Sequence, residues 1–308
     1  MSLLIVGTVA FDAIETPFGK TEKIIGGAAT YIGLAASNFT NKVNLVSVVG
    51  NDFPQDAIEM MKKHNINTEG LQIIKDGKTF FWSGKYHNDM NSRDTLITEL
   101  NVLADFNPVV PDSYQDCDFL MLGNLTPSVQ LSVINQLKKR PKFIAMDTMN
   151  FWMDNALDDL KKVISKVDVL TINDEEARQL SGEYSLVKAA QKILKMGLKY
   201  LIIKKGEHGA LLFDTKKVFF APALPLKEVF DPTGAGDTFA GGFMGYLSAT
   251  KDISFENMKR AIIYASALAS FTVEKFGIER LLELNKKLIN DRVRLFIDLS
   301  QFEIELDE

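Results

Sequence analysis

Short apolar runs recur along the chain, separated by longer stretches with helical periodicity. We expect buried strands at residues 3–6, 43–48, 119–122, 143–146, 169–172 and 200–203. We expect helices between them, at residues 28–38, 56–64, 128–139, 175–180 and 185–196. This alternation predicts an α/β fold in which helices cover both faces of a mainly parallel sheet.

Two stretches break this pattern, at about residues 13–25 and 72–100, where polar and aromatic residues alternate. We expect antiparallel or edge strands outside the main sheet, which together form a small β lid. The lid aromatics could be a sheet core, a dimer surface or a substrate wall: Phe80, Phe81, Trp82 and Tyr86. Since no repeat or linker divides the chain, we expect a single domain over residues 1–308.

Composition limits the function classes. The net charge of −5 argues against nucleic acid as the main partner. The single cysteine, Cys117, excludes an internal disulfide framework and is expected to be a buried structural thiol. There is neither a long apolar run nor a signal-like N-terminus, so we expect a cytoplasmic protein with no membrane partner. Residues 279–308 predict a helix followed by a solvated acidic tail.

The strongest chemical signal is the segment Asp231-Pro-Thr-Gly-Ala-Gly-Asp237, followed by Thr-Phe-Ala-Gly-Gly-Phe243 and a helical pattern. A glycine loop at a helix start leaves backbone N–H groups free for phosphate oxygens, and a β-carbon there would block the anion. Asp237 at the mouth of this loop could accept the proton of an attacking hydroxyl. Its alternative role is that of a helix N-cap.

This segment resembles the second signature of the ribokinase-like (PfkB) carbohydrate kinase family at every position. The resemblance implies a three-layer α/β/α kinase fold, with ATP and Mg²⁺ as cofactors and Asp237 as the catalytic base. It implies an anion hole formed by the amides of Gly234, Ala235 and Gly236. Asp231 and Thr233 would lie at the loop entry, near the ATP phosphates or a monovalent cation such as K⁺.

The N-terminal region carries the expected substrate residues. Asp12 follows the first strand, and in similar kinases this aspartate holds substrate hydroxyls. Gly26 and Gly27 resemble the glycine pair of the family's first signature, which lines the substrate. Tyr31 replaces the usual asparagine of that signature, so it could offer a hydroxyl or a stacking face for a base.

Two further motifs resemble the family's nucleotide side. Asn173 and Glu176 match an Asn-x-x-Glu motif that would hold Mg²⁺ and its water shell, although the same residues could simply cap a helix. Lys204, Gly206 and Gly209 match a strand–Gly-x-x-Gly–strand segment that borders the nucleotide.

Asn124 and Asn150 are further candidate pocket residues, because each follows an expected strand of the main sheet. Asn150 lies in the segment Asp147-Thr-Met-Asn-Phe-Trp152, which resembles a DxNxR-like segment of related kinases but shifts the asparagine and lacks the arginine.

The resulting hypothesis is an ATP-dependent kinase that phosphorylates a hydroxyl of a sugar, sugar acid or similar small molecule. A nucleoside kinase of the same fold is the alternative, and a ligand-binding module without catalysis is a third possibility, disfavoured by the intact Asp237. The exposed sheet edge expected for the lid suggests a homodimer.

Overall fold

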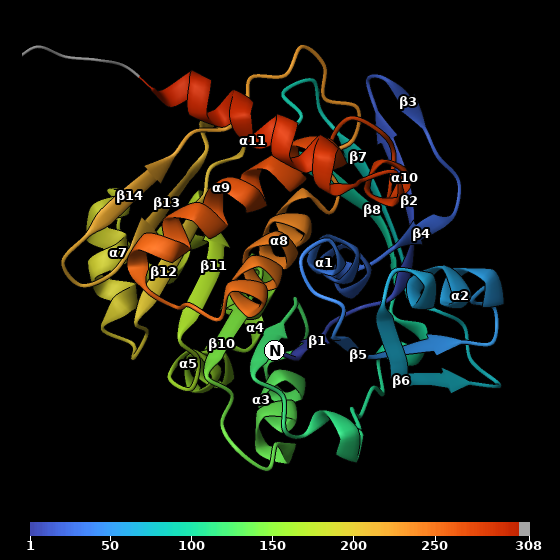
Figure 1. The fold of residues 1–308 in the computed structure, drawn as a ribbon. Coiled ribbons are helices and arrows are strands. Elements are labelled where there is room, and N and C mark those ends of the chain that lie inside the picture. The colour runs from blue at the N-terminus through green and yellow to red at the C-terminus, as the bar shows by residue number, and fades with distance from the viewer. Residues whose placement is uncertain (302–308) are drawn as a thin grey trace, which may run out of the picture.

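The computed structural model describes residues 1–301, which contain two β-sheets (Figure 1). The larger sheet has nine strands in the order β14-β13-β12-β11-β10-β9-β1-β5-β6. In chain order they are β1 (Leu3–Val6), β5 (Val43–Gly50), β6 (Ile66–Ile74), β9 (Phe119–Leu122), β10 (Phe143–Asp147), β11 (Val169–Asn173), β12 (Tyr200–Lys204), β13 (Ala210–Phe213) and β14 (Val218–Ala221). Neighbours from β6 to β12 are parallel, and β13 and β14 pair antiparallel. The mainly parallel α/β sheet predicted from the sequence is confirmed.

Helices cover both faces of this sheet. One face carries α1 (Ala28–Ser37), α2 (Gln55–Lys63), α8 (Ala235–Thr250), α9 (Phe255–Thr272) and α10 (Glu279–Leu282). The other carries α3 (Pro127–Gln136), α4 (Asn150–Asn155), α5 (Leu157–Ile164), α6 (Asp174–Ser181) and α7 (Leu186–Leu194). Helix α11 (Lys286–Ser300) packs on α9, and short 3₁₀ turns lie at η1 (Asn101–Leu103), η2 (Asp112–Tyr114) and η3 (Gly206–His208).

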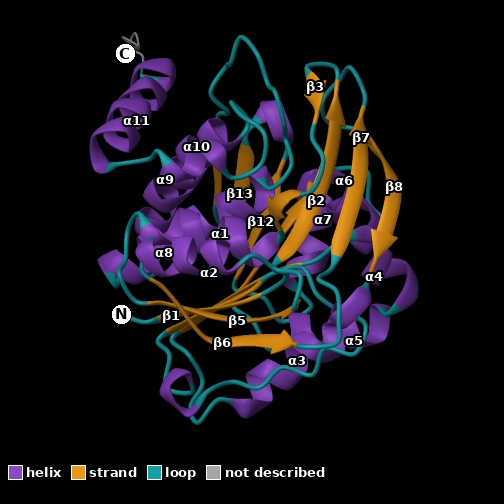
Figure 2. Ribbon diagram, turned by 90° about the vertical axis from the view of Figure 1, so that its right-hand side faces the viewer, coloured by secondary structure: helices purple, strands orange, loops and turns teal. Residues whose placement is uncertain are grey.

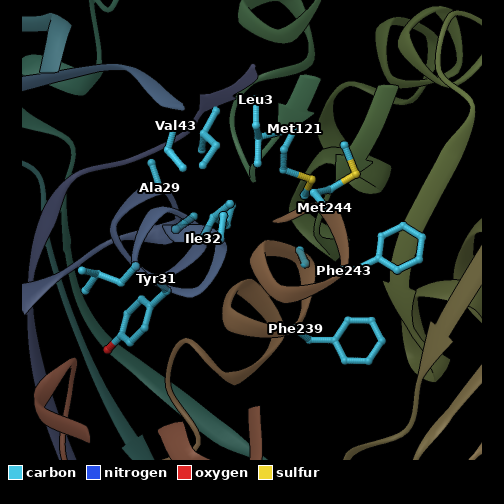
Figure 3. Close-up of a cluster of buried hydrophobic side chains, with 14 of the residues drawn as sticks. Leu3, Ala29, Tyr31, Ile32, Val43, Met121, Phe239, Phe243 and Met244 are labelled. Atoms are coloured by element: carbon cyan, nitrogen blue, oxygen red, sulfur yellow. The ribbon is translucent and has the colours of Figure 1, made fainter. Parts of the chain in front are cut away.

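The core explains why the strands are continuous apolar runs. In β1, Leu3 and Ile5 point to one helical layer and Leu4 to the other, and all three are fully buried. A strand covered on both faces has no position for a polar side chain. Figure 3 shows part of the first layer, where Leu3 lies near Ile32 of α1 and Met244 of α8.

The second sheet stands beside the carboxyl ends of the main strands (Figure 2). It contains β2 (Ala10–Thr16), β3 (Gly19–Lys20), β4 (Ile24–Gly26), β7 (Phe81–Tyr86) and β8 (Arg93–Glu99), in the order β3-β2-β7-β8 with β4 paired to β2. We call this sheet the lid. It differs from the expected segments in two ways: it begins at Ala10, and residues 72–74 belong to β6 of the main sheet. The sequence predicted antiparallel or edge strands for the lid. The pairs β2–β3, β2–β4 and β7–β8 are antiparallel, whereas β2 and β7 pair in parallel.

Three predicted strands run one residue further than expected, to Asp147 in β10, Asn173 in β11 and Lys204 in β12. These added residues are polar and lie at the edge of the sheet that faces the lid. The expected C-terminal helix is divided into α10 and α11, and the predicted acidic tail at 303–308 lies outside the described residues. Among residues 1–301, no helix is long and apolar enough to cross a membrane.

Candidate active site

The carboxyl ends of β10 and β12 bring two opposite charges together. The Lys204 ammonium lies 2.8 Å from Asp147 Oδ2, and both side chains are largely buried. Burial disfavours the charged lysine, but the nearby carboxylates of Asp147, Glu176 and Asp237 outweigh this effect and raise the pKa of Lys204. A cation is therefore fixed at this edge of the sheet. Sequence reasoning proposed Lys204 but missed Asp147 as a site residue.

The glycine loop before α8 is held by the carboxylate of Asp231, which is fully buried. Its Oδ1 accepts the Thr233 amide N–H at 2.9 Å, and its Oδ2 accepts the Gly277 amide N–H at 2.9 Å. Gly234 follows in the left-handed region, with φ 74°, and the helix begins at Ala235. Asp231 thus anchors the loop, so that the first amides of α8 are presented at a fixed position.

Asp237 lies in the first turn of α8 and faces these charges. Loss of surrounding water raises its pKa to about 7; Asp147 adds to the rise, while Lys204 and Arg93 oppose it. A β-carbon at Gly236 would lie 3.1 Å from Lys204 Nζ, so the ammonium lies directly beside the loop. The structure therefore places a carboxylate, a buried cation and the first amides of α8 in one site. Of the three predicted anion-hole amides, that of Ala235 already donates to the Pro232 carbonyl oxygen at 3.2 Å, whereas those of Gly234 and Gly236 have no acceptor among residues 1–301.

Asp12 in β2 is buried against the glycine pair. A β-carbon at Gly26 would overlap its Oδ2, and the nearby Gly27 backbone acts to lower the pKa of Asp12. Burial raises the pKa of Asp12 to about 7, with Asp231 and Asp237 adding to the rise. The predicted substrate residues Asp12, Gly26 and Gly27 are thus brought together, close to the charges of the α8 loop.

Tyr31 differs from one of its expected roles. Its ring is 1% exposed and packs against Gly234, where a β-carbon would overlap it, so no face is open for a base. The expectation of a stacking face is therefore wrong. The Tyr31 hydroxyl is buried and has no hydrogen-bond partner among the described residues, and in Figure 3 it points away from the apolar side chains. Burial and the carboxylates of the site raise its pKa well above the usual value.

Asn173 and Glu176 form a capping box at the start of α6. Asn173 Oδ1 accepts the Glu176 amide N–H and Glu176 Oε2 accepts the Asn173 amide N–H, both at 2.7 Å. This is the capping role considered for these residues from the sequence. Glu176 is nevertheless buried beside Asp147, and burial first, then Asp147, raises its pKa to about 7.

The glycine turn after β12 has the backbone that its sequence requires. Gly206 and Gly209 both have positive φ, at 55° and 80°, and a β-carbon at Gly209 would overlap the carbonyl oxygen of Ala221. A β-carbon at Gly206 would lie 2.7 Å from Asn91 Oδ1, at the turn between β7 and β8. The turn between β7 and β8, at the tip of the lid, therefore reaches the glycine turn after β12.

Asn124 and Asn150 use their amides locally. Asn124 Oδ1 accepts the Trp152 indole N–H at 2.9 Å, and the Asn150 amide donates to Gln179. Within residues 1–301, neither amide is hydrogen-bonded to Asp12 or Asp237.

The inner face of the lid carries Arg93, which sequence reasoning did not assign, beside Trp82 and Tyr86, for which it left three roles open. Asp12 is the register partner of Trp82, and Tyr86 that of Arg93. The Trp82 ring lies over Gly84, where a β-carbon would overlap it. Tyr86 reaches the α8 loop, since its hydroxyl oxygen accepts a hydrogen bond from Thr233 Oγ1 at 3.2 Å. The alternation of side chains along the lid strands could have indicated which residues share the inner face, but only if the pairing register of these strands had been known.

Comparison with known proteins agrees with this geometry. The model of the pfkB family carbohydrate kinases matches residues 2–283. A cytidine kinase of Thermococcus kodakarensis is 32% identical over 253 residues, covering 80% of this chain and 88% of the relative.

Two solved structures share the fold. The nucleoside kinase of Burkholderia thailandensis in complex with inosine has a TM-score of 0.79 at 19% identity, covering 96% of this chain and 99% of the other. A putative ribokinase II from E. coli in complex with ATP and Mg²⁺ has a TM-score of 0.78 at 20% identity, covering 97% and 99%. The predicted ribokinase-like fold is confirmed. The chain is therefore a phosphotransferase with a hydroxyl acceptor and belongs to the pfkB family of carbohydrate kinases.

Proposed function

We propose that this kinase transfers the γ-phosphoryl group of ATP to a hydroxyl of a nucleoside. The observation that carries the proposal is the register pairing of Asp12 with Trp82 on the inner face of the lid. Paired strands lie about 4.8 Å apart, so a carboxylate suited to ribose hydroxyls lies beside an indole suited to a base. The cytidine kinase relative supports the same substrate class.

A free sugar or sugar acid is the second candidate. Asp12, Gly26 and Gly27 would suit its hydroxyls equally well, and the family description favours carbohydrates. Trp82 distinguishes the two candidate substrates, because a free sugar has no aromatic base that could stack on the indole ring.

Asp237 is the proposed general base. Its carboxylate accepts the proton of the acceptor hydroxyl as the oxygen attacks in line, and a pKa of about 7 suits this task near neutral pH. The amides of Gly234 and Gly236, which have no acceptor among residues 1–301, receive the charge that develops on the transferred group. Lys204, held by Asp147 beside Gly236, adds a fixed positive charge.

Several features support ATP and Mg²⁺ as cofactors. The loop amides and Lys204 suit phosphate oxygens, and the turn at Gly206 and Gly209 gives the backbone close approach. Glu176 would help to hold Mg²⁺ and its waters, since only one of its oxygens is used in the capping box among the described residues. Bound ATP supplies the phosphoryl group, and Mg²⁺ offsets the charge of the phosphates.

The proposal includes a monovalent cation such as K⁺ beside Asp231 and Thr233. The Asp231 carboxylate is fully buried, and no basic side chain pairs with it within residues 1–301. Replacing K⁺ by choline in the assay tests this assignment, since turnover should then fall.

The proposal also includes a homodimer formed through the lid. Strand β8 is an edge strand whose residues are all exposed, including Leu96 and Ile97. Light scattering of the wild type and of Leu96→Asp tests it, because the charge would separate the subunits. A cytoplasmic location stays a prediction from the single, buried Cys117.

Substrate class is tested by fluorescence, because the chain has only two tryptophans, Trp82 and Trp152. In the Trp152→Phe variant, the remaining tryptophan is Trp82. Cytidine should quench its fluorescence, whereas ribose should not. In Trp82→Phe, Trp152 is the matched control, and cytidine should leave its emission unchanged.

Kinetics complete the test. Trp82→Ala should raise the KM for the nucleoside about tenfold or more, the loss expected for one base–aromatic stack. If the wild type instead phosphorylates ribose with a kcat/KM equal to or above that for every nucleoside tested, the carbohydrate assignment replaces this one.

A further inference from the structure

Arg93 begins β8 and lies on the inner face of the lid, opposite Tyr86. Its guanidinium carbon lies 5.8 Å from the centre of the Trp82 ring and 6.0 Å from the centre of the Tyr86 ring. Two aromatic rings thus hold a permanent cation on the side of the lid that faces the active site.

The hairpin that carries Arg93 touches both segments assigned above to the nucleotide phosphates. On one side Thr233 Oγ1 donates to the Tyr86 hydroxyl at 3.2 Å, and on the other Asn91 lies against Gly206. Between these contacts the turn is braced by Asp89, which accepts the amide N–H groups of Asn91 and Ser92 at 3.0 and 2.9 Å. Arg93 therefore lies on a braced hairpin between the two loops.

The N–H groups of the Arg93 guanidinium remain available as hydrogen-bond donors. Within residues 1–301, Arg93 has neither an ion pair nor a hydrogen bond to a carboxylate, whereas Arg178 and Arg292 each pair with one carboxylate and Arg280 pairs with two. Its charge nevertheless acts on the site, since it lowers the pKa of both Asp237 and Glu176 against the larger effect of burial. A planar guanidinium with free N–H groups is the side chain best suited to two oxygens of one phosphoryl group.

We propose that Arg93 binds the phosphoryl group while it moves from ATP to the acceptor, so that the lid supplies part of the catalytic machinery. Asp237 takes the acceptor's proton, the acceptor oxygen forms its bond to the γ-phosphorus, and the bond to the β–γ bridging oxygen breaks, with its electron pair leaving on ADP. Arg93 remains protonated throughout and contributes charge and orientation only. This role rests on the phosphate positions of the proposed function, and it does not depend on the acceptor being a nucleoside.

The test compares Mg–ADP with Mg–AMP-PNP binding by calorimetry, without any acceptor, in wild type, Arg93→Met and Arg93→Lys. Lys85→Met is the matched control, because Lys85 is a cation of the same hairpin on its outer face, paired with Glu15 at 2.7 Å. Arg93→Met should weaken AMP-PNP binding about tenfold or more, the loss expected for a charged hydrogen-bonded contact, and leave ADP binding unchanged. Arg93→Lys should recover part of this loss, and Lys85→Met should match the wild type.

Equal AMP-PNP affinity in wild type and Arg93→Met overturns the inference, and so does an equal loss for ADP and AMP-PNP. Thermal unfolding of each variant shows whether the lid variants remain folded, and Arg93→Lys, which keeps the charge over the rings, carries the test if Arg93→Met does not fold. A selective AMP-PNP defect in an enzyme that phosphorylates no nucleoside would reject the nucleoside proposal and leave the role of Arg93 standing.

Discussion

The ring of Tyr31 packs against Gly234, the N-cap of α8 in the proposed anion-binding loop. Gly234 has φ 74°, and a β-carbon there would overlap the ring. Substrate-side helix α1 and phosphate-side helix α8 are therefore in contact at the residue that orients the loop amides. Any side chain at Gly234 must move the ring, the loop or both.

We predict that Gly234→Ala lowers kcat about 10²-fold, because displacement of a catalytic loop by about 1 Å costs this much. Gly182→Ala is the matched control: Gly182 has a similar φ of 69°, but nothing lies within 4 Å of the added β-carbon. Both variants carry the backbone cost of an alanine at positive φ, so both should lose stability in thermal unfolding. Only Gly234→Ala should lose turnover, and equal activity of the two would show that the Tyr31 contact is irrelevant to catalysis.

Asp237→Asn should reduce turnover by about 10²–10⁴, the range for loss of a general base, while ATP binding is retained. Glu256→Gln is a suitable control, since Glu256 also lies in the first turn of a helix but pairs with Lys259 outside the site. Stopped assays with the preferred acceptor measure the effect. Near-normal turnover of Asp237→Asn would remove this residue from the mechanism and leave it as a helix-start acid.

Activity should fall as the pH drops below about 7. Asp237 has a pKa raised to about 7 by burial, and its protonated form cannot accept the hydroxyl proton. Burial raises the pKa values of Asp12 and Glu176 to about 7 as well. The fall in activity at low pH should therefore report the combined titration of the three carboxylates rather than that of Asp237 alone. The measurement is kcat/KM for the acceptor from pH 5.5 to 9 at saturating Mg–ATP. A profile that stays flat to pH 5.5 would contradict the raised pKa of the base.

The same carboxylates should make the fold more stable in mild acid. Because their folded-state pKa values lie above the unfolded ones, the folded protein binds more protons between about pH 4 and 7, and its stability falls as the pH rises through this window. Asp12→Asn removes a buried charge that is present mainly above pH 7. We therefore expect it to raise Tm by about 2 °C or more at pH 8 and by less at pH 5. An equal change in Tm at both pH values would contradict this assignment.

Six of the nine strands of the main sheet were predicted as apolar runs, for a physical reason. Strands buried on both faces must be apolar throughout, so runs such as Leu3–Val6 and Phe119–Leu122 were found to the residue. The apolar pattern stops before Asp147, Asn173 and Lys204, and for that reason it missed the polar last residues of three strands. Asp237 could be proposed as the base because its loop has a specific pattern of residues.

The lid face could not be predicted, because its chemistry depends on pairing between distant segments. Asp12 meets Trp82 only through a parallel register between β2 and β7, which no local pattern specifies. Arg93 starts a strand whose residues are all exposed, so its sequence is typical of a solvated edge. One of the two roles considered for Tyr31, a stacking face for a base, requires an open ring, but Gly234 of the α8 loop packs on the ring.

Coupled ADP release from Mg–ATP, with cytidine, other nucleosides, ribose, fructose and sugar acids as acceptors, tests the central claim most directly. We predict that a nucleoside stimulates ADP release above every free sugar, and that Asp237→Asn abolishes the stimulation while still binding ATP. Stimulation that persists in Asp237→Asn, or a wild type that prefers a free sugar, would contradict a nucleoside kinase with Asp237 as its base.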